Sequence, residues 1–312
     1  MSEDRADELA QLRRELLGQV PYLLRYHPAD SVVAVFAGAD RYIRVAARTD
    51  LAAPPAMVIA QWTAAARRVG AASAVVIGYG PRTAAVRVTA VADGLAAQVP
   101  VADVLLVTGG QFFCLRCPCP AAAGVRFDPA ATIVAARLTM AGEVALASRE
   151  DLLALAEPDP AGQAAVSAVL AEVSGDADSP AVLRYLMEQA ADGHRLTAAD
   201  MAWLARMLRE PAVRDLAVRA TGTVMWQRDL WLDATRRMPA GYVAAPASLA
   251  GWCAWRRGEE LLAVTACRRA LADDPGYLFA RLILHAIVSG VPPQALLAGR
   301  PHSTTPAGGE LL

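Results

Sequence analysis

Two hydrophobic patterns follow one another along the chain and divide it into two halves. In the first half, short runs of β-branched and aromatic residues stand between turn residues, which is typical of strands. In the second half, apolar residues recur every three or four positions, which is typical of helices. We predict a mixed-sheet α/β layer domain at residues 1–156, an all-α domain at residues 163–300 and a loose tail at residues 301–312. The Pro- and Asp-rich stretch "AEPDPAG" between the two domains is the predicted linker.

The α/β half is predicted to contain about five strands and three helices in layers. A further helix at residues 4–18 precedes them, and a loop, "VPYLLRYHPADS", follows that helix. The helix is predicted because Leu9, Leu12, Leu16 and Val20 recur at helical spacing behind an acidic first turn. The predicted strands are 31–38, 41–51, 73–80, about 103–108 and 111–117, and the predicted helices are 53–71, 82–99 (with a strand as the alternative) and 128–142.

The helical half contains one specific local pattern near its C-terminus. The stretch "GWCAWRRGEELLAVTACRRALADDP" matches small and turn positions of a tetratricopeptide repeat, where small residues let two antiparallel helices approach closely. We predict a tetratricopeptide-like hairpin at residues 247–290. Either this hairpin only completes the core of the domain, or it forms a groove that binds a peptide or protein. The matching positions are Gly251, Gly258, Ala263, Ala270 and Pro275, while Ala247 stands where the repeat has a large tryptophan.

Composition and charge exclude several classes of function. The 312 residues are 55% hydrophobic and 20% charged, which is the profile of a folded globular protein. The net charge of −1 gives no electrostatic case for binding nucleic acid or an anionic membrane. All 30 basic residues are arginine, so this lysine-free, arginine-rich chain cannot use a P-loop lysine, a Schiff-base lysine or a lysine general base.

The sequence carries no sign of export or of membrane insertion. No segment reaches the roughly 18–20 apolar residues that a membrane helix needs. The N-terminus, "MSEDRADELAQLRREL", lacks the apolar core of a signal peptide. The five cysteines are odd in number and three of them are clustered, which is untypical of a secreted disulfide scaffold. We therefore expect a cytoplasmic protein.

Three cysteines lie within six residues, in the stretch "GGQFFCLRCPCPAAAG". In a continuous strand, Cys117 and Cys119 would point to one face of the sheet and Cys114 to the other. A structural zinc site needs four ligands, so His27, Cys253 or a distant acid would have to complete it. We favour buried structural thiols, and we keep a redox-responsive site and a metal site as alternatives.

A glycine-rich turn offers a second candidate site. The stretch "VVIGYGPRT" places Gly78 and Gly80 at the end of a strand and Arg82 at the start of a helix, which resembles the beginning of a dinucleotide-binding motif. Arg82 at a helix N-terminus would suit a phosphate. The third glycine position of the motif holds Thr83, however, and a turn that needs glycine is the simpler interpretation.

A polar loop offers a third candidate site. The stretch "RYHPADS" contains Arg25, His27, Asp30 and Ser31, which are residue types that hydrolases use. The chain contains no G-x-S-x-G nucleophile elbow, however. Asp30 and Ser31 before a strand are explained more simply as a turn and a cap.

Five stretches occur in an order that resembles a known family. They are "VPYLLRYHPADSVVAV", "RVAARTDL", the cysteine stretch, "ASREDLLAL" and "ALADDPGYLFARLILHAIVSGVPP". Together they look like the actinobacterial family known as domain of unknown function 4192, over about residues 15–298. The chain departs from the family pattern where Cys114 replaces a serine and Pro118 separates two cysteines that are usually adjacent. The resemblance implies no reaction. The positions at which the chain follows the family pattern are Pro21, Pro28, Asp30 and Ser31 in the first loop, Asp50 after the hairpin, and the segment with Cys117, Cys119 and Pro120.

Two hypotheses about function follow. The first is a cytoplasmic binding or scaffold protein that contacts a protein partner through its helical domain, without catalysis or a cofactor, because the sequence shows no complete catalytic constellation. The second is an enzyme, or a sensor of a nucleotide or phosphate, with a site at the strand ends of the α/β domain. The candidate residues of that site are Arg25, His27, Asp30, Ser31, Asp50, Gly78, Gly80 and Arg82.

Overall fold

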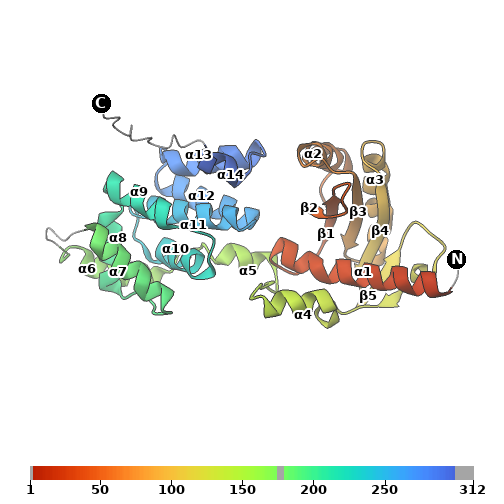
Figure 1. The fold of residues 1–312 in the computed structure, drawn as a ribbon, viewed down its shortest axis with the longest axis horizontal. Coiled ribbons are helices and arrows are strands. Elements are labelled where there is room, and N and C mark those ends of the chain that lie inside the picture. Colours follow the sequence, from red (N-terminus) through yellow and green to blue (C-terminus); the bar gives the residue numbers. More distant parts are fainter. Residues whose placement is uncertain (1–2, 174–178, 299–312) are drawn as a thin grey trace, which may run out of the picture. The chain divides into compact units, whose positions relative to one another are not determined.

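The computed structural model describes residues 3–173 and 179–298 of the chain (Figure 1). The chain divides into two compact units, Met1–Leu152 and Leu153–Leu312. The first unit is built on a mixed sheet and the second is helical, as the two hydrophobic patterns predicted. The tail predicted at residues 301–312 lies outside the described residues.

The first unit contains a six-stranded sheet in the order β2-β1-β3-β4-β5-β6. Strands β3 and β4 are parallel and are connected through helix α3, while the other neighbouring pairs are antiparallel. The sequence predicted about five strands, and the additional one, β6, has only two residues and gives no periodic pattern. The strands are β1 (Ser31–Ala37), β2 (Ile43–Asp50), β3 (Ser73–Tyr79), β4 (Val101–Thr108), β5 (Gln111–Cys114) and β6 (Val125–Arg126).

Helices cover both faces of this sheet (Figure 1). Helix α1 (Glu3–Leu24) crosses one face, where its Leu17 belongs to a core that also contains Phe112 of β5. Helices α2 (Pro55–Arg68) and α3 (Ala85–Ala96) cover the other face, where Trp62 and Phe36 belong to a second core. The alternation of side chains along each strand supplies both cores, since neighbouring residues point to opposite faces. The remaining elements of the unit are the short helices η1 (Arg82–Ala84), η2 (Pro120–Ala122) and η3 (Pro129–Ala131), and α4 (Ile133–Met140).

Helix α1 is longer than predicted, and its buried face includes only part of the predicted apolar stripe. The sequence predicted that it ends at residue 18 and that Pro21 lies in a loop, but the helix continues to Leu24. Pro21 removes one backbone hydrogen bond, and burial of Val20 against the sheet compensates for that loss. Leu12 of the predicted stripe is 62% exposed, whereas Val20 of the same stripe is buried together with Leu17, which the stripe did not include.

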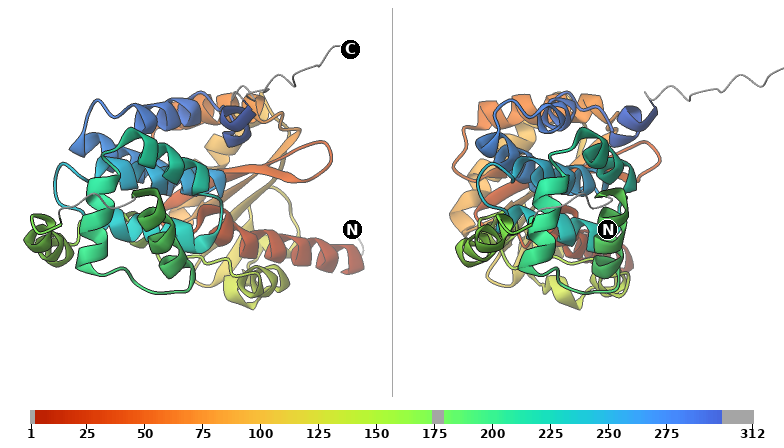
Figure 2. Two further views of the ribbon diagram at one scale, coloured as in Figure 1. Left: turned by 60° about the vertical axis from the view of Figure 1, so that its left-hand side comes forward. Right: turned by 90° about the vertical axis from the view of Figure 1, so that its left-hand side faces the viewer.

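The second unit consists of helices throughout, coloured green to blue in Figure 2. The predicted linker contains the start of one of them, since the Asp159 carboxylate accepts a hydrogen bond from the Gly162 backbone N–H at 3.0 Å and caps α6. The predicted capping box at Thr197 and Asp200 is present at the start of α8. The helices after residue 148 are α5 (Arg149–Ala154), α6 (Pro160–Leu170), α7 (Ser179–Ala191), α8 (Ala198–Met207), α9 (Pro211–Ala220), α10 (Met225–Arg237), α11 (Ala244–Arg256), α12 (Glu260–Asp273), α13 (Leu278–Val288) and α14 (Pro293–Ala298).

Helices α11 and α12 form a tightly packed hairpin within the predicted repeat. A Cβ atom placed on Gly251 would lie 2.5 Å from the Sγ atom of Cys267 and 3.1 Å from the carbonyl oxygen of Ala263. Gly251 is therefore needed for the close approach of the two helices. Likeness of this hairpin to a tetratricopeptide repeat stays a prediction. Across the described parts of both units, every helix is too short or too polar to cross a membrane.

Candidate functional site

The three clustered cysteines converge just beyond the end of β5. The strand ends at Cys114, and the chain bends through Cys117 and Cys119 before η2 begins. The three Sγ atoms lie within 4.8 Å of one another, and those of Cys114 and Cys117 are 3.2 Å apart. The prediction that Cys114 points away from the other two was wrong, because the strand ends before Pro118 and the alternation of a strand does not continue.

The guanidinium of Arg13 from α1 contacts all three sulfur atoms, and we call these four residues the thiol cluster. Its two terminal nitrogens donate to the Sγ atoms of Cys119 and Cys114 at 3.3 Å each, and to that of Cys117 at 3.8 Å. Arg13 is only 6% exposed, so water competes little for these hydrogen bonds. A guanidinium has no acceptor, so each sulfur must accept, and a thiolate accepts more strongly than a thiol.

Asp103 of β4 fixes the orientation of Arg13. Its carboxylate accepts hydrogen bonds from Nε at 2.6 Å and from a terminal nitrogen at 3.1 Å, which is the two-point pairing that suits a guanidinium. The remaining N–H groups of the guanidinium are thereby directed at the sulfur atoms. The sequence analysis assigned neither Arg13 nor Asp103 to a site. The available signal was a carboxylate directly before the buried run Val104–Leu106 of β4.

The cluster gives its thiols different acidities. Burial by itself would raise the pKa of Cys119, but hydrogen bonds from Cys117 and Arg13 outweigh it and lower this pKa to about 7. Burial dominates at Cys114 and raises its pKa to about 11. Since the thiolate is the nucleophilic form, Cys119 is the cysteine of this cluster that is prepared for chemistry near neutral pH.

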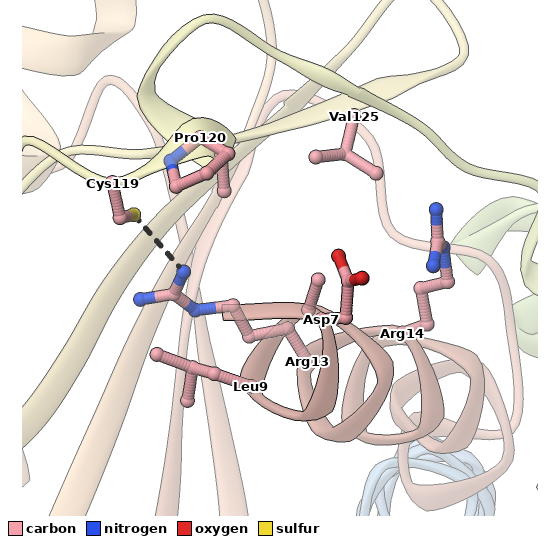
Figure 3. Close-up of a pocket in the computed structure, with 9 residues that line it drawn as sticks. Asp7, Leu9, Arg13, Arg14, Cys119, Pro120 and Val125 are labelled. Atoms are coloured by element: carbon pink, nitrogen blue, oxygen red, sulfur yellow. Dashed lines mark hydrogen bonds between the residues drawn. The ribbon is translucent and has the colours of Figure 1, made fainter. Parts of the chain in front are cut away.

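A cavity of about 130 Å³ lies beside Cys119 (Figure 3). The figure shows Cys119 at one end of the lining, with a hydrogen bond to Arg13, and Arg14 at the other end. Asp7 lies between the two arginines on α1. Cys119 is therefore the sulfur that a small molecule in this cavity would meet. The lining comes from α1 (including Asp7, Leu9, Arg13 and Arg14) and from the segment after β5 (including Cys119 and Pro120).

The residues present suit a thiolate better than a metal ion. Three cysteines with this spacing could supply three ligands to a thiophilic metal, and zinc would need a fourth. The nearest carboxylate, that of Asp103, is engaged by Arg13 at two points. The guanidinium already places a positive charge against the same sulfur atoms, and a metal cation would be repelled by it. We therefore favour thiol chemistry at this site.

The structure brings part of the predicted strand-end site together. Ser31 of β1 is the register partner of Asp50 in β2 and of Tyr79 in β3, so these three residues lie side by side at one end of their strands. The carboxylate of Asp30 lies against Gly80, and that of Asp50 pairs with Arg48 at 2.5 Å. The two carboxylates at this end of the strands would repel a negatively charged phosphate ligand.

The remaining predicted residues point to other roles. Arg25 pairs with Glu143, and the exposed His27 donates its backbone N–H to the carbonyl of Leu146. The guanidinium carbon of Arg82 lies 3.8 Å from the centroid of the Phe113 ring. This cation–π contact engages the positive charge that would bind a phosphate. Gly78 provides space for α3, since a Cβ atom there would lie 2.3 Å from the side chain of Val88.

The helical unit contains a larger groove between α9 and the start of α13. Its volume is about 460 Å³, within the range of ligand pockets. Leu278 and Leu282 of this region are 65% and 48% exposed, which is unusual for large apolar side chains at one place. The groove is lined by residues of α9 and of the segment around the start of α13, namely Arg214, Asp215, Val218, Asp274, Gly276, Tyr277, Leu278, Phe279 and Leu282.

Comparison with known proteins identifies a family but no close relative. No curated protein and no solved structure matches the chain. A family model described as Domain of unknown function (DUF4192) matches residues 14–294, which is most of the chain and includes the cysteines of the thiol cluster.

Proposed function

The chain belongs to the DUF4192 family, and we propose that it is a redox-responsive protein whose thiol cluster forms a disulfide reversibly. The observation that carries this proposal is the convergence of three sulfur atoms on one buried guanidinium. Structural cysteines do not need such a partner, and a buried arginine that holds three thiols is costly to maintain without a use.

The proposed reaction uses a low-molecular-weight disulfide as the oxidant. The Cys119 thiolate attacks one sulfur of the oxidant, a mixed disulfide forms, and the other half of the oxidant leaves as a thiolate. Cys117 then loses its proton to solvent and attacks the Sγ atom of Cys119, which releases the second half of the oxidant. Two electrons have passed from two cysteines to the oxidant, and a thiol-containing reductant reverses the sequence.

Exchange within the cluster completes the proposed sequence. The thiolate form of Cys114, whose sulfur lies 3.2 Å from that of Cys117, attacks Cys117 and restores the Cys119 thiolate. The end state is a Cys114–Cys117 disulfide across a two-residue spacing. This exchange consumes no further oxidant, because one disulfide is replaced by another.

The test is disulfide mapping by mass spectrometry after titration of the whole protein with mixtures of 2-hydroxyethyl disulfide and 2-mercaptoethanol, an acyclic disulfide and its thiol. We expect a Cys114–Cys117 disulfide in the wild type and slow oxidation in Cys119→Ser. Cys267→Ser is the matched control, because Cys267 is buried in another unit and should leave the oxidation rate unchanged. Three thiols that stay reduced at every ratio while the protein remains folded would refute the proposal.

A reversible thiol site of this kind fits the cytoplasm, which is the location that we propose. Reducing compartments keep unpaired cysteines as thiols, and all five cysteines of this chain are unpaired. Fractionation of source cells with an antibody to the protein tests the location.

We propose a second function for the helical unit, namely binding of a protein partner in the groove at α13. The exposed leucines and the carboxylates of Asp215 and Asp274 favour a peptide segment that carries apolar side chains and one basic side chain. Arg214 of the same lining stacks over the ring of Tyr277. Leu282→Asp should abolish retention of the partner in crosslinking experiments. Val288→Asp is the matched control, because Val288 lies on the same helix, is 75% exposed and does not line the groove. Equal retention by both variants would exclude the groove.

A further inference from the structure

The two ends of the cavity beside Cys119 carry different chemical groups. Cys119 and Arg13 lie at one end, and Asp7 and Arg14 lie toward the other (Figure 3). The rest of the lining is apolar and consists of Leu9, Ala10, Pro120, Ala121 and Val125. A molecule that fills this space therefore needs a sulfur atom at one end, a short apolar stem, and charged groups at the other end.

The two charged groups at the far end are opposite in sign and project from one face of α1. Asp7 and Arg14 are seven residues apart, which is two helical turns, so both side chains reach the same cavity. Within the described part of the chain, neither side chain has a hydrogen-bond or ion-pair partner. A carboxylate would pair with the guanidinium of Arg14, and an ammonium group would pair with the carboxylate of Asp7.

From this arrangement we propose that the oxidant of the thiol cluster is a disulfide of the amino-acid type, whose α-carboxylate binds Arg14 and whose α-ammonium binds Asp7. This inference rests on the proposed redox function and names its substrate class. One half of the molecule occupies the cavity with its sulfur at Cys119, and the other half extends toward solvent as the leaving group. The small volume of about 130 Å³ suits one such half better than a peptide.

The covalent step is the same thiol–disulfide exchange, with an amino-acid disulfide as the oxidant. The Cys119 thiolate forms a bond to the sulfur of the bound half, the S–S bond of the oxidant breaks, and the outer half leaves as an amino-acid thiolate. Attack by Cys117 then releases the bound half. One cystine-type molecule becomes two cysteine-type thiols, and the protein gains one disulfide.

The experiment compares three symmetrical disulfides as probes of the full-length protein. Cystine carries both charged groups, cystamine lacks the carboxylates, and dithiodipropionate lacks the ammonium groups. The rate of mixed-disulfide formation at Cys119 is measured by mass spectrometry, and each rate is divided by the wild-type rate for the same probe. These ratios remove differences in intrinsic reactivity between the probes.

Two variants separate the two charge contacts. Arg14→Met should lower the rate about two- to fivefold with cystine and dithiodipropionate, the size expected for one exposed ion pair, and leave cystamine unaffected. Asp7→Asn should lower the rate with cystine and cystamine to a similar extent and leave dithiodipropionate unaffected. Glu8→Gln is the matched control, because Glu8 is exposed on α1 outside the cavity and should leave all three ratios at one.

The outcomes distinguish this inference from the function on which it rests. Equal ratios for all probes in Arg14→Met and Asp7→Asn would overturn the amino-acid-type substrate while leaving the redox function intact. Failure of Cys119 to react with any of the three disulfides in the folded protein would overturn both.

Discussion

Replacement of Arg13 by methionine tests whether this side chain is what makes Cys119 acidic. The guanidinium donates to the Cys119 sulfur at 3.3 Å. A hydrogen bond to a charged group contributes about 1.5–3 kcal/mol, and one pKa unit corresponds to about 1.4 kcal/mol, so the loss amounts to about one to two units. The pKa of Cys119 should therefore rise from about 7 to about 8–9.

The assay is the pH dependence of iodoacetamide alkylation at Cys119, followed by mass spectrometry. Arg14→Met is the matched control, because Arg14 lines the same cavity but makes no hydrogen bond to a sulfur of the cluster. It should leave the pKa of Cys119 unchanged. An unshifted titration midpoint in folded Arg13→Met would refute the electrostatic reasoning, and Cys117 would then be the main cause of the acidity.

Loss of stability is the complication, since Arg13→Met leaves the Asp103 carboxylate without its partner. Breaking a buried ion pair by removing one side costs about 3–5 kcal/mol. The double variant Arg13→Met/Asp103→Leu replaces the whole pair by apolar groups and should recover most of this loss. It should still show the raised pKa of Cys119, which keeps the test decisive if the single variant unfolds.

Three further predictions concern the pH dependence of stability, the buried thiols of the helical unit and the hairpin. The pKa of Cys119 is about 7 in the folded state and 9.0 ordinarily, so the unfolded state binds more protons between these two pH values. The free energy of unfolding should therefore rise by at most about 3 kcal/mol from pH 7 to pH 9. Urea unfolding of Cys119→Ser should not show this rise. Burial raises the pKa of Cys253 to about 11 and that of Cys267 to about 12, so mass spectrometry should find neither alkylated by iodoacetamide at pH 8 in the folded protein, and fast labelling of either would contradict their burial. Gly251→Ala should destabilise the helical unit by about 1–3 kcal/mol through contact with Cys267, measured by urea unfolding, and a neutral effect would show that the hairpin can move apart.

The elements of the sheet could be predicted because each strand carries its own local pattern. The runs in β1, β3 and β4 are apolar and bounded by turn residues, and the structure confirms them as strands. The inward face of α1 could not be fixed in the same way. Leu12 and Leu17 both fit a helical period, and only the sheet that α1 covers decides that Leu17 is the buried one.

The thiol cluster could be predicted only in part, because its activating residues are distant in the sequence. The three cysteines stand out as a group, but a spacing says nothing about an arginine in another element. Strand geometry placed Cys114 on the wrong side because it assumed that the strand continues past the position where it ends. The strand-end site stays a prediction, and the sequence could not show that two of its members already have partners, Arg25 in Glu143 and Arg82 in the ring of Phe113.

The sequence separation within the cluster has a consequence for the newly synthesised protein. Arg13 meets Asp103 across 90 residues and Cys119 across 106 residues, so the contacts that acidify the thiol are non-local. At typical rates of synthesis, about 5–20 s pass between the appearance of Arg13 and that of Cys119. Until α1 docks on the finished sheet, the chain carries three ordinary thiols with pKa values near 9.0. An acidic Cys119 therefore reports that the first unit has completed its folding, and on the ribosome the unfinished chain exposes thiols that are less reactive near neutral pH than Cys119 of the folded protein.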